Sequence, residues 1–239
     1  IEYDGTNFVG WQMQKNGLSI QEVLQKVLKK LLNEKIILFG SGRTDTGVHA
    51  IEQSAHFRIR NDIKNKERFL KSVNFFLKNY SISVLNVKKK PKTFHARYSA
   101  KKRTYKYLII NRISPLSLKK KRAWHIIKKL DPKLMKRGAI ILKGTRDFST
   151  YRASSCKAKT PIKTLDKVSV KKTKDTIQIT FASRSFLQQQ VRSMVGCLKY
   201  LGEKKWDLKT FDKVFKSKKR LLCAPPAPPE GLFLARVIY

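Results

Sequence analysis

The chain has 239 residues and contains 54 lysines and arginines against 16 aspartates and glutamates, so its formal net charge is +38. This length holds one large domain or two of ordinary size, and 41% hydrophobic residues suffice for a substantial core. The positive excess predicts a polyanionic partner, with nucleic acid as the first candidate. No apolar run approaches the roughly 18 residues that a membrane span needs.

Charge alone does not say which polyanion is bound. Much of the excess is lysine, in a chain also rich in Ile, Asn and Phe, as AT-rich codon usage would produce. A run such as Lys119–Arg122 is more typical of a solvated protein face than of a phosphate contact.

The chain has three cysteines, Cys156, Cys197 and Cys223, an odd number without a Cys-x-x-Cys spacing. This usage favours a reduced, cytoplasmic setting over a disulfide framework. The four histidines show no His-Glu-x-x-His or similar grouping, so we predict no metal site.

The first part of the chain predicts the order β-α-β-β-α-β, the split arrangement of a ferredoxin-like sandwich. Ser19 and Glu22 form a capping box ahead of apolar residues at three- and four-residue spacing, which predicts a helix from Ile20 to Leu32. A second amphipathic helix is predicted at 69–77. The predicted strands occupy residues 1–3, 35–39, 51–59 and 81–87.

After a linker at 88–92, the alternation of strands and helices is roughly repeated. Asp131 and Pro132 supply an N-cap and a first-position proline for a helix that ends near Leu142. The other predicted elements are helices at 187–200 and 208–215 and strands at the end of the stretch 101–110 and at 164–170, 176–182 and 232–238. We therefore predict an α/β (α+β) fold of two lobes, residues 1–91 and 92–239, whose sheets form a broad platform with a cleft between them.

The stretch Gly40–Ala50 is the most informative local pattern. Three glycines within eight residues indicate a backbone that bends sharply or approaches a ligand closely. The stretch also carries Arg43, Asp45 and His49, and predicted strands flank it on both sides. A loop between two strands can hold such groups exposed on a rigid scaffold.

Asp45 lies close to an arginine in a very basic chain, so we expect its carboxylate to be ionised. An ionised carboxylate suits a nucleophile or an ion-paired base better than a proton donor. The alternative is a Gly/Asp-rich turn in which Asp45 caps its own backbone. Local pattern alone leaves both interpretations open.

Four parts of the chain, taken in order, resemble the tRNA pseudouridine synthase A family. They are Tyr3–Gln12, Gly42–Ala50, Phe94–Arg97 with Arg103–Tyr107, and Phe186–Gly196. The Thr-Asp-x-Gly-Val-His element at 44–49 is the specific part, whereas a Tyr-x-Tyr pair alone would be weak. The chain departs from the family at Gln188–Gln190, where relatives often carry histidine.

The resemblance implies two ferredoxin-like lobes with antiparallel sheets and a basic cleft, working as a homodimer without cofactor or metal. It implies isomerisation of uridine to pseudouridine at positions 38, 39 and 40, in the anticodon stem-loop of tRNA. The reaction breaks the N1–C1′ bond, turns the uracil and rejoins it through C5, so a nucleophile in a tight pocket can suffice.

By the same resemblance, Asp45 is the catalytic nucleophile or base and Arg192 is its ion-pair partner. Tyr105 stacks on the uracil, and Arg43 fills the space left by the flipped nucleotide or contacts a phosphate. Two alternatives remain: Arg192 as a surface arginine of a helix, and Tyr105 as a core aromatic facing the same side as Tyr107.

Two other classes of function compete with this hypothesis. A non-catalytic basic RNA-binding protein would present exposed aromatic side chains with basic neighbours on its sheets, but it gives no reason for the Asp45 loop. A glycoside hydrolase acting on nucleic acid would need a pair of carboxylates, and no motif here supplies the second one.

Overall fold

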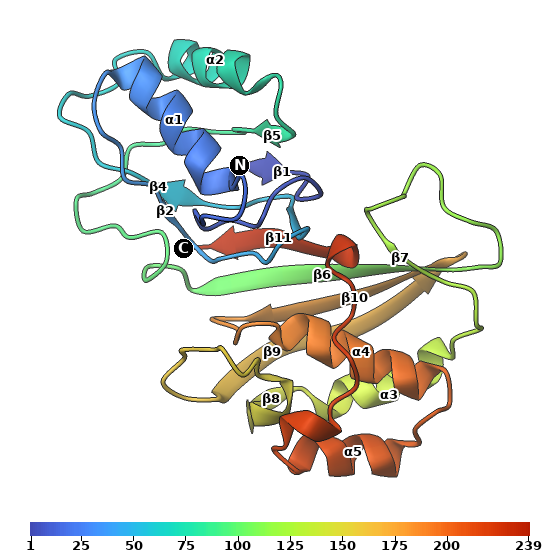
Figure 1. Cartoon of the computed structure of the whole chain (residues 1–239). Helices are drawn as coiled ribbons and strands as arrows, with labels where there is room; N and C mark the ends of the chain where they lie inside the picture. The colour runs from blue at the N-terminus through green and yellow to red at the C-terminus, as the bar shows by residue number, and fades with distance from the viewer. The chain divides into compact units, whose positions relative to one another are not determined.

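The computed structural model describes all 239 residues and divides into two compact units (Figure 1). The first unit comprises Ile1–Lys101 and Phe233–Tyr239, and the second comprises Lys102–Leu232. Residues 92–101 and the last strand therefore belong to the first compact unit. The division predicted from the sequence had assigned them to the second lobe. The last strand returns to the first unit through long-range pairing, which local sequence patterns do not reveal.

The sheet of the first unit has the order β5-β1-β3-β11. Strand β1 is antiparallel to both of its neighbours, and β11 runs parallel to β3 with Phe233 opposite His49. Strands β2 and β4 form a separate antiparallel pair. The strands are β1 (Glu2–Tyr3), β2 (Phe39–Gly40), β3 (His49–Ala50), β4 (Ala55–His56), β5 (Ile82–Ser83) and β11 (Leu232–Ile238).

Two helices, α1 (Ile20–Leu32) and α2 (Lys66–Leu77), pack together in this unit (Figure 1). The hydroxyl of Ser19 accepts a hydrogen bond from the Glu22 amide at 3.2 Å, so α1 begins at its predicted cap. Apolar residues spaced three and four apart line its buried face: Ile20, Val23, Leu24, Val27 and Leu28. Both helices are therefore confirmed.

The strands predicted at 35–39 and 51–59 are mostly irregular. In this part of the chain, the strand that joins the main sheet of the first unit is β3, which lies inside the stretch predicted as a loop. The amides of Ile51 and Glu52 both donate to the carbonyl of Leu234, at 2.8 and 3.3 Å, so the chain bends away directly after β3. Pairing with β11 decides which two residues are extended, and the apolar pattern of 51–59 carries no information about that pairing.

The sheet of the second unit has the antiparallel order β6-β10-β9-β8, and the short strand β7 pairs in parallel with β6. The strands are β6 (Lys102–Asn111), β7 (Trp124–Ile126), β8 (Gly144–Asp147), β9 (Ile162–Thr173) and β10 (Thr176–Ser183). The sequence predicted β6, β9 and β10 but missed β7 and β8, which are only three and four residues long. The mixed α/β class with mainly antiparallel strands is confirmed.

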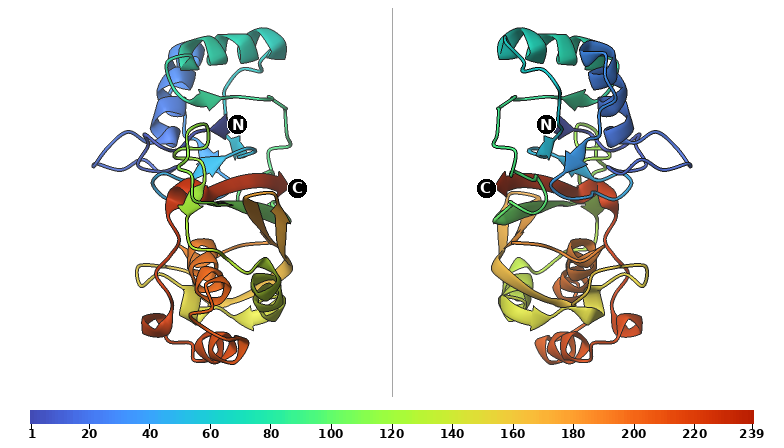
Figure 2. Two further views of the ribbon diagram at one scale, coloured as in Figure 1. Left: turned by 90° about the vertical axis from the view of Figure 1, so that its right-hand side faces the viewer. Right: turned by 90° about the vertical axis from the view of Figure 1, so that its left-hand side faces the viewer.

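Three helices belong to the second unit: α3 (Pro132–Ile141), α4 (Gln190–Gly202) and α5 (Leu208–Lys216). They pack on one another, and α3 packs on β9, so the helices back this sheet (Figures 1 and 2). The Asp131 carboxylate accepts from the Leu134 amide at 3.0 Å, which confirms the predicted N-cap of α3. None of the five helices combines the length and apolar character that a bilayer crossing requires.

Candidate active-site elements

Asp45 lies in the loop between β2 and β3 of the first unit. Its carbonyl accepts a hydrogen bond from the Val48 amide at 3.1 Å, closing a turn. Gly47 within that turn has φ +75°, a left-handed conformation that favours glycine. The side chain of Asp45 is half-buried, so the loop presents it at the surface of a fixed turn.

The N-terminal segment holds the backbone on both sides of this aspartate. The Trp11 amide donates to the carbonyl of Thr44 at 3.0 Å, and the Thr44 hydroxyl is 2.8 Å from the Tyr3 hydroxyl. On the other side, the hydroxyl of Thr46 donates to the carbonyl of Val9 at 3.0 Å. The two family-like segments at 3–12 and 42–50 thus form one structural unit.

Two glycines of the N-terminal segment make this close approach possible. A Cβ on Gly10, which has φ +104°, would lie 2.6 Å from the carbonyl oxygen of Thr44. A Cβ on Gly5 would lie 2.1 Å from the carbonyl oxygen of Val48. Any side chain at either position would push the loop out of place.

His49 has a structural role in the loop. Its Nδ1 accepts a hydrogen bond from the Gly5 amide at 3.0 Å, and its ring stacks on Phe233 with centroids 4.7 Å apart. Asp4 Oδ1 is also 3.1 Å from Nδ1, but that oxygen already accepts from the amide and hydroxyl of Thr6. We therefore assign the lone pair of Nδ1 to the amide bond.

Gln53 fixes the start of the loop, and sequence analysis missed it. The residue is 1% exposed, its Oε1 accepts from the Ser41 hydroxyl at 2.6 Å, and its Nε2 donates to the Gly42 carbonyl at 2.9 Å. The available signal was a polar side chain inside a run predicted as a strand. Arg43, by contrast, is exposed ahead of Asp45.

Tyr105 lies on β6 of the second unit, on the face that this strand buries together with Tyr107. It is 8% exposed and meets the ring of Phe186 edge to face, with centroids 5.2 Å apart. In register it stands opposite Phe181 of β10. Phe186 comes from one of the family-like segments, so two of those segments meet at this ring.

Tyr107 differs from Tyr105 although both face the same side. It is completely buried, and its hydroxyl donates to the carbonyl of Pro228 at 2.8 Å. Burial, with a smaller contribution from Glu230, raises the pKa of this hydroxyl above its ordinary value. Tyr107 therefore serves the core of the second unit.

Arg103 shares the buried face of β6 and is a residue that sequence analysis did not single out. It is 7% exposed, and its guanidinium donates to the carbonyl of Arg184. The detectable signal was a charged residue two positions before Tyr105 in a strand, because alternate residues face the same side. Its buried positive charge lies next to Tyr105 along the strand.

Arg192 lies in the first turn of α4 and is half-buried. Its Nε donates to the carbonyl of Ala227 at 2.7 Å, and the Ala227 amide donates back to the Arg192 carbonyl at 2.9 Å. One turn later, a Cβ on Gly196 would lie 2.0 Å from the carbonyl oxygen of Pro225. The proline-rich segment 224–229 therefore packs closely on α4 and fixes the plane of the guanidinium, so Arg192 is not an unconstrained surface arginine.

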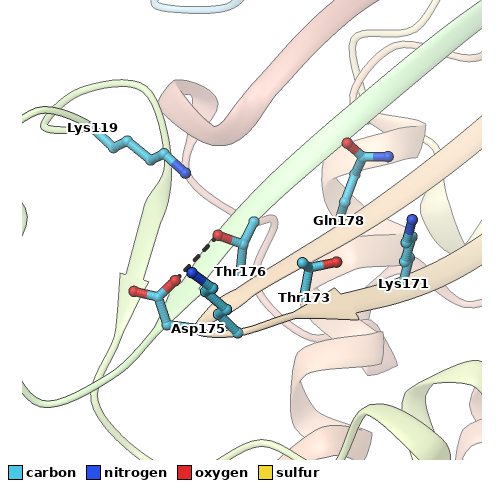
Figure 3. A pocket seen from close by; sticks show the side chains of 7 residues that line it. Lys119, Lys171, Thr173, Asp175, Thr176 and Gln178 are labelled. Atoms are coloured by element: carbon cyan, nitrogen blue, oxygen red, sulfur yellow. Dashed lines mark hydrogen bonds between the residues drawn. The ribbon is translucent and has the colours of Figure 1, made fainter.

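The second unit also has a basic hollow of about 450 Å³ at the turn between β9 and β10 (Figure 3). It is lined by Lys119, Lys171, Thr173, Lys174, Asp175, Thr176 and Gln178. Thr176 begins β10, whereas Phe181, opposite Tyr105, lies five residues on, about 17 Å along a strand. The Asp175 carboxylate is 2.9 Å from a guanidinium nitrogen of Arg112. The hollow suits an anion but is remote from Tyr105.

Neither unit gathers three or more His, Cys, Asp or Glu side chains in a way that could hold a metal ion. Within the second unit, Tyr105 and Arg192 belong to the same compact body, while Asp45 and Arg43 belong to the first. These features define a basic α/β protein with a clamped aspartate loop and separately held tyrosine and arginine side chains. A carboxylate, a phenol and a guanidinium held on fixed backbone are candidates for catalysis on an anionic substrate.

Comparison with known proteins identifies the family. A family model described as tRNA pseudouridine synthase matches residues 1–99 and 139–239. The chain is similar over all 239 residues to tRNA pseudouridine synthase A of Pelagibacter ubique, at 64% identity and 97% of that protein's length. It is 42% identical, with 97% of the relative covered, to the enzyme of Parvibaculum lavamentivorans, and 44%, with 93% covered, to that of Paramagnetospirillum magneticum. The chain belongs to the tRNA pseudouridine synthase family and is an isomerase.

Proposed function

We propose that the chain converts uridine to pseudouridine in the anticodon stem-loop of tRNA, at positions 38, 39 and 40. Family membership and the relatives' names support tRNA as the substrate, and the net charge of +38 suits a polyanion. The single observation that carries a catalytic role over simple binding is the Asp45 loop. Its backbone is held on both sides by hydrogen bonds, while Asp45 as a residue is only partly buried.

In this proposal Asp45 acts as the nucleophile or base that starts the reaction. The N1–C1′ bond breaks, the uracil turns, C5 bonds to C1′, and the C5 proton is lost while N1 regains one. Nothing is oxidised and no group leaves the RNA, so the chain's own side chains supply the chemistry without cofactor or metal. A clamped loop suits this role because small displacements of a nucleophile cost large factors in rate.

Tyr105 is proposed to stack on the uracil and to serve the proton step at C5. The edge-to-face contact with Phe186 supports this role, because it holds the ring in one orientation. Tyr107 is the weaker candidate, since its hydroxyl is hydrogen-bonded to the carbonyl of Pro228.

Arg192 is proposed as the partner that orients the Asp45 carboxylate, and the proposal requires the two to meet during the reaction. The Nε bond to Ala227 supports it, since a fixed guanidinium plane favours one carboxylate geometry. Arg43 is proposed to occupy the gap left by the flipped nucleotide, or to contact a phosphate; its exposure suits either role.

The experiment is incubation with unmodified tRNA, followed by pseudouridine mapping and RNA mass measurement. We expect pseudouridine at positions 38, 39 and 40 with no change in RNA mass, and no product at a position where cytidine replaces uridine. Binding without pseudouridine would favour the RNA-binding alternative, and a mass loss equal to uracil minus one water would favour a hydrolase. Either result would overturn the proposal.

The homodimer and the cytoplasmic location stay predictions. The homodimer is tested by sedimentation velocity over a range of concentrations, and the location by fractionation of cells that express the full-length protein. A monomer at working enzyme concentrations would contradict the expected assembly.

A further inference from the structure

Two cysteines of the second unit lie next to each other, although 26 positions separate them. The sulfurs of Cys197 and Cys223 are 3.5 Å apart. Cys197 is completely buried in α4, while Cys223 is half-exposed directly after the short helix η2 (Arg220–Leu222). The pair was not foreseen, because its spacing matches no cysteine motif.

The two sulfurs have different surroundings. Arg220 Nη1 lies 3.4 Å from the sulfur of Cys223 and donates to the Ser193 hydroxyl at 2.7 Å. A hydrogen bond from Cys197 and the Arg220 charge lower the pKa of Cys223. The same hydrogen bond between the two thiols, together with burial, raises the pKa of Cys197. Thiolate character is therefore concentrated on the more accessible sulfur.

Cys223 is partly exposed and follows an exposed stretch of chain. The preceding residues Leu221 and Leu222 are 98% and 50% exposed. The third cysteine, Cys156, is buried, and no other cysteine sulfur is bonded to it. A partly exposed thiol with a lowered pKa beside a second thiol is the usual arrangement of a peroxide-sensitive pair.

We propose that Cys223 and Cys197 form a reversible oxidation site that a peroxide converts to a disulfide. The Cys223 thiolate attacks the O–O bond of hydrogen peroxide, giving a sulfenic acid and hydroxide. The Cys197 thiol then attacks the sulfenic sulfur, giving the disulfide and water. Two thiols are oxidised and one peroxide is reduced, and a dithiol reductant reverses the change.

The disulfide would act on α4 and the proline-rich segment 224–229. Its formation shortens the sulfur separation from 3.5 Å to about 2.05 Å, drawing Cys223 toward the helix. Ala227, four residues after Cys223, exchanges two hydrogen bonds with Arg192. We therefore expect oxidation to move the group that orients Arg192 and to lower turnover, a consequence that rests on the proposed function.

The test exposes the folded protein to a small molar excess of hydrogen peroxide, then denatures and alkylates it. The parent should lose the mass of two hydrogens and keep one alkylatable thiol of its three, with a cross-linked Cys197–Cys223 peptide. Cys156→Ser should give the same cross-link. Cys197→Ala should instead accumulate a trappable sulfenic acid at Cys223.

Arg220 offers a matched pair of variants. Arg220→Gln should slow the reaction of Cys223 with peroxide by about tenfold, because the charge that favours the thiolate is gone. Arg220→Lys keeps a positive charge and should stay within about threefold of the parent. Equal rates for Gln and parent would remove Arg220 from the proposal.

The outcomes separate the oxidation site from the enzymatic function. Three alkylatable thiols after treatment, or oxidation of Cys223 without a cross-link, would overturn the oxidation site. A full disulfide with unchanged turnover would overturn only its connection to Arg192, and we expect about a tenfold fall that a reductant reverses. A protein without turnover before treatment would contradict the proposed function. The mass and alkylation measurements would still decide whether Cys197 and Cys223 form the disulfide.

Discussion

Asp45 is partly buried, and other residues fix the backbone on which it lies. The carbonyl and hydroxyl of Thr44, one residue earlier, both form hydrogen bonds with the N-terminal segment. Gln53 donates a hydrogen bond to the carbonyl of Gly42 at the start of the loop. The loop backbone therefore has supports other than the Asp45 side chain. A substitution that keeps its size should separate chemistry from folding.

Asp45→Asn should abolish pseudouridine formation, with a fall of at least about 1,000-fold in single-turnover rate, as expected for loss of a catalytic nucleophile or base. Asparagine keeps the size and can hydrogen-bond within the turn, but it supplies no carboxylate. Melting temperature should stay close to that of the parent, and tRNA affinity should hold or rise slightly.

The control is mass spectrometry of the same preparation, which excludes deamidation back to aspartate. If Asp45 only capped its turn, the variant would lose some stability and activity would fall only with the folded fraction. A folded, RNA-binding variant that works near the parental rate would show that Asp45 is not catalytic.

Tyr105 and Tyr107 form a matched pair on one face of β6. Tyr105→Phe should lower turnover by roughly 100-fold if its hydroxyl serves the proton step. Tyr107→Phe should instead lower stability by about 1–3 kcal/mol, because the buried carbonyl of Pro228 loses its donor. Chemical denaturation and single-turnover assays of both variants check this; the opposite pattern would exchange the roles assigned to the two tyrosines.

At the scale of elements, close backbone packing positions the candidate groups. Gly10 allows the N-terminal segment to reach the Asp45 loop, and Gly196 allows the proline-rich segment to reach α4. Both contacts are too close for a Cβ. The functional groups therefore depend on glycines that carry no chemistry themselves.

Gly10→Ala should lower both stability, by about 1–3 kcal/mol, and turnover, because its Cβ would meet the Thr44 carbonyl at 2.6 Å. Gly144→Ala is the matched control: Gly144 has a similar φ of +95°, but nothing lies within 4 Å of its added Cβ. The control should lose stability alone. Equal turnover in the two folded variants would argue against loop positioning by Gly10.

Arg192→Lys should reduce turnover by roughly 100-fold while tRNA affinity and melting temperature change little. Lysine keeps the positive charge but loses the planar fork, and it cannot bond Ala227 through Nε while orienting a carboxylate. Single-turnover rates, tRNA affinity and thermal melting of the same variant check this. A parental rate would remove Arg192 as the partner of Asp45.

For the whole molecule, the dominant property is the net charge of +38. Lysines are spread over the chain and line the hollow at the β9–β10 turn, so many of them can contribute weakly to phosphate contacts. Exposed charges of this kind act mainly through the release of counterions from the RNA.

Binding of tRNA should therefore weaken steeply with salt, with a log–log slope of roughly −5 to −9 if six to ten phosphates are contacted. Single Lys→Gln variants should each change the slope by no more than about one. Affinity measured across a salt series, with the catalytically impaired Asp45→Asn protein as a comparison, checks this. A nearly flat plot would show that the basic surface is not the RNA surface.

Local sequence signals determined the helices and the long strands. The capping of α1 by Ser19 and of α3 by Asp131, and the predicted strand at 232–238, all match the structure, because caps and side-chain periodicity act within a few residues. The glycine pattern around Asp45 likewise marked the candidate loop without any long-range information.

Only the tertiary structure decided what depends on distant pairing. It placed β3 at His49–Ala50, returned β11 to the first unit, and buried Gln53 and Arg103 as supports. It also distinguished the roles of Tyr105 and Tyr107, which the alternation along β6 places on the same face. Only the structure shows that the Tyr107 hydroxyl donates a hydrogen bond to the carbonyl of Pro228. The β3–β11 pairing and the contacts of Arg103 and Tyr107 join residues many tens of positions apart, and those of Gln53 cross 11 and 12 positions. Such contacts leave no trace in a short stretch of sequence, whereas caps, turns and helical faces are encoded by their immediate neighbours.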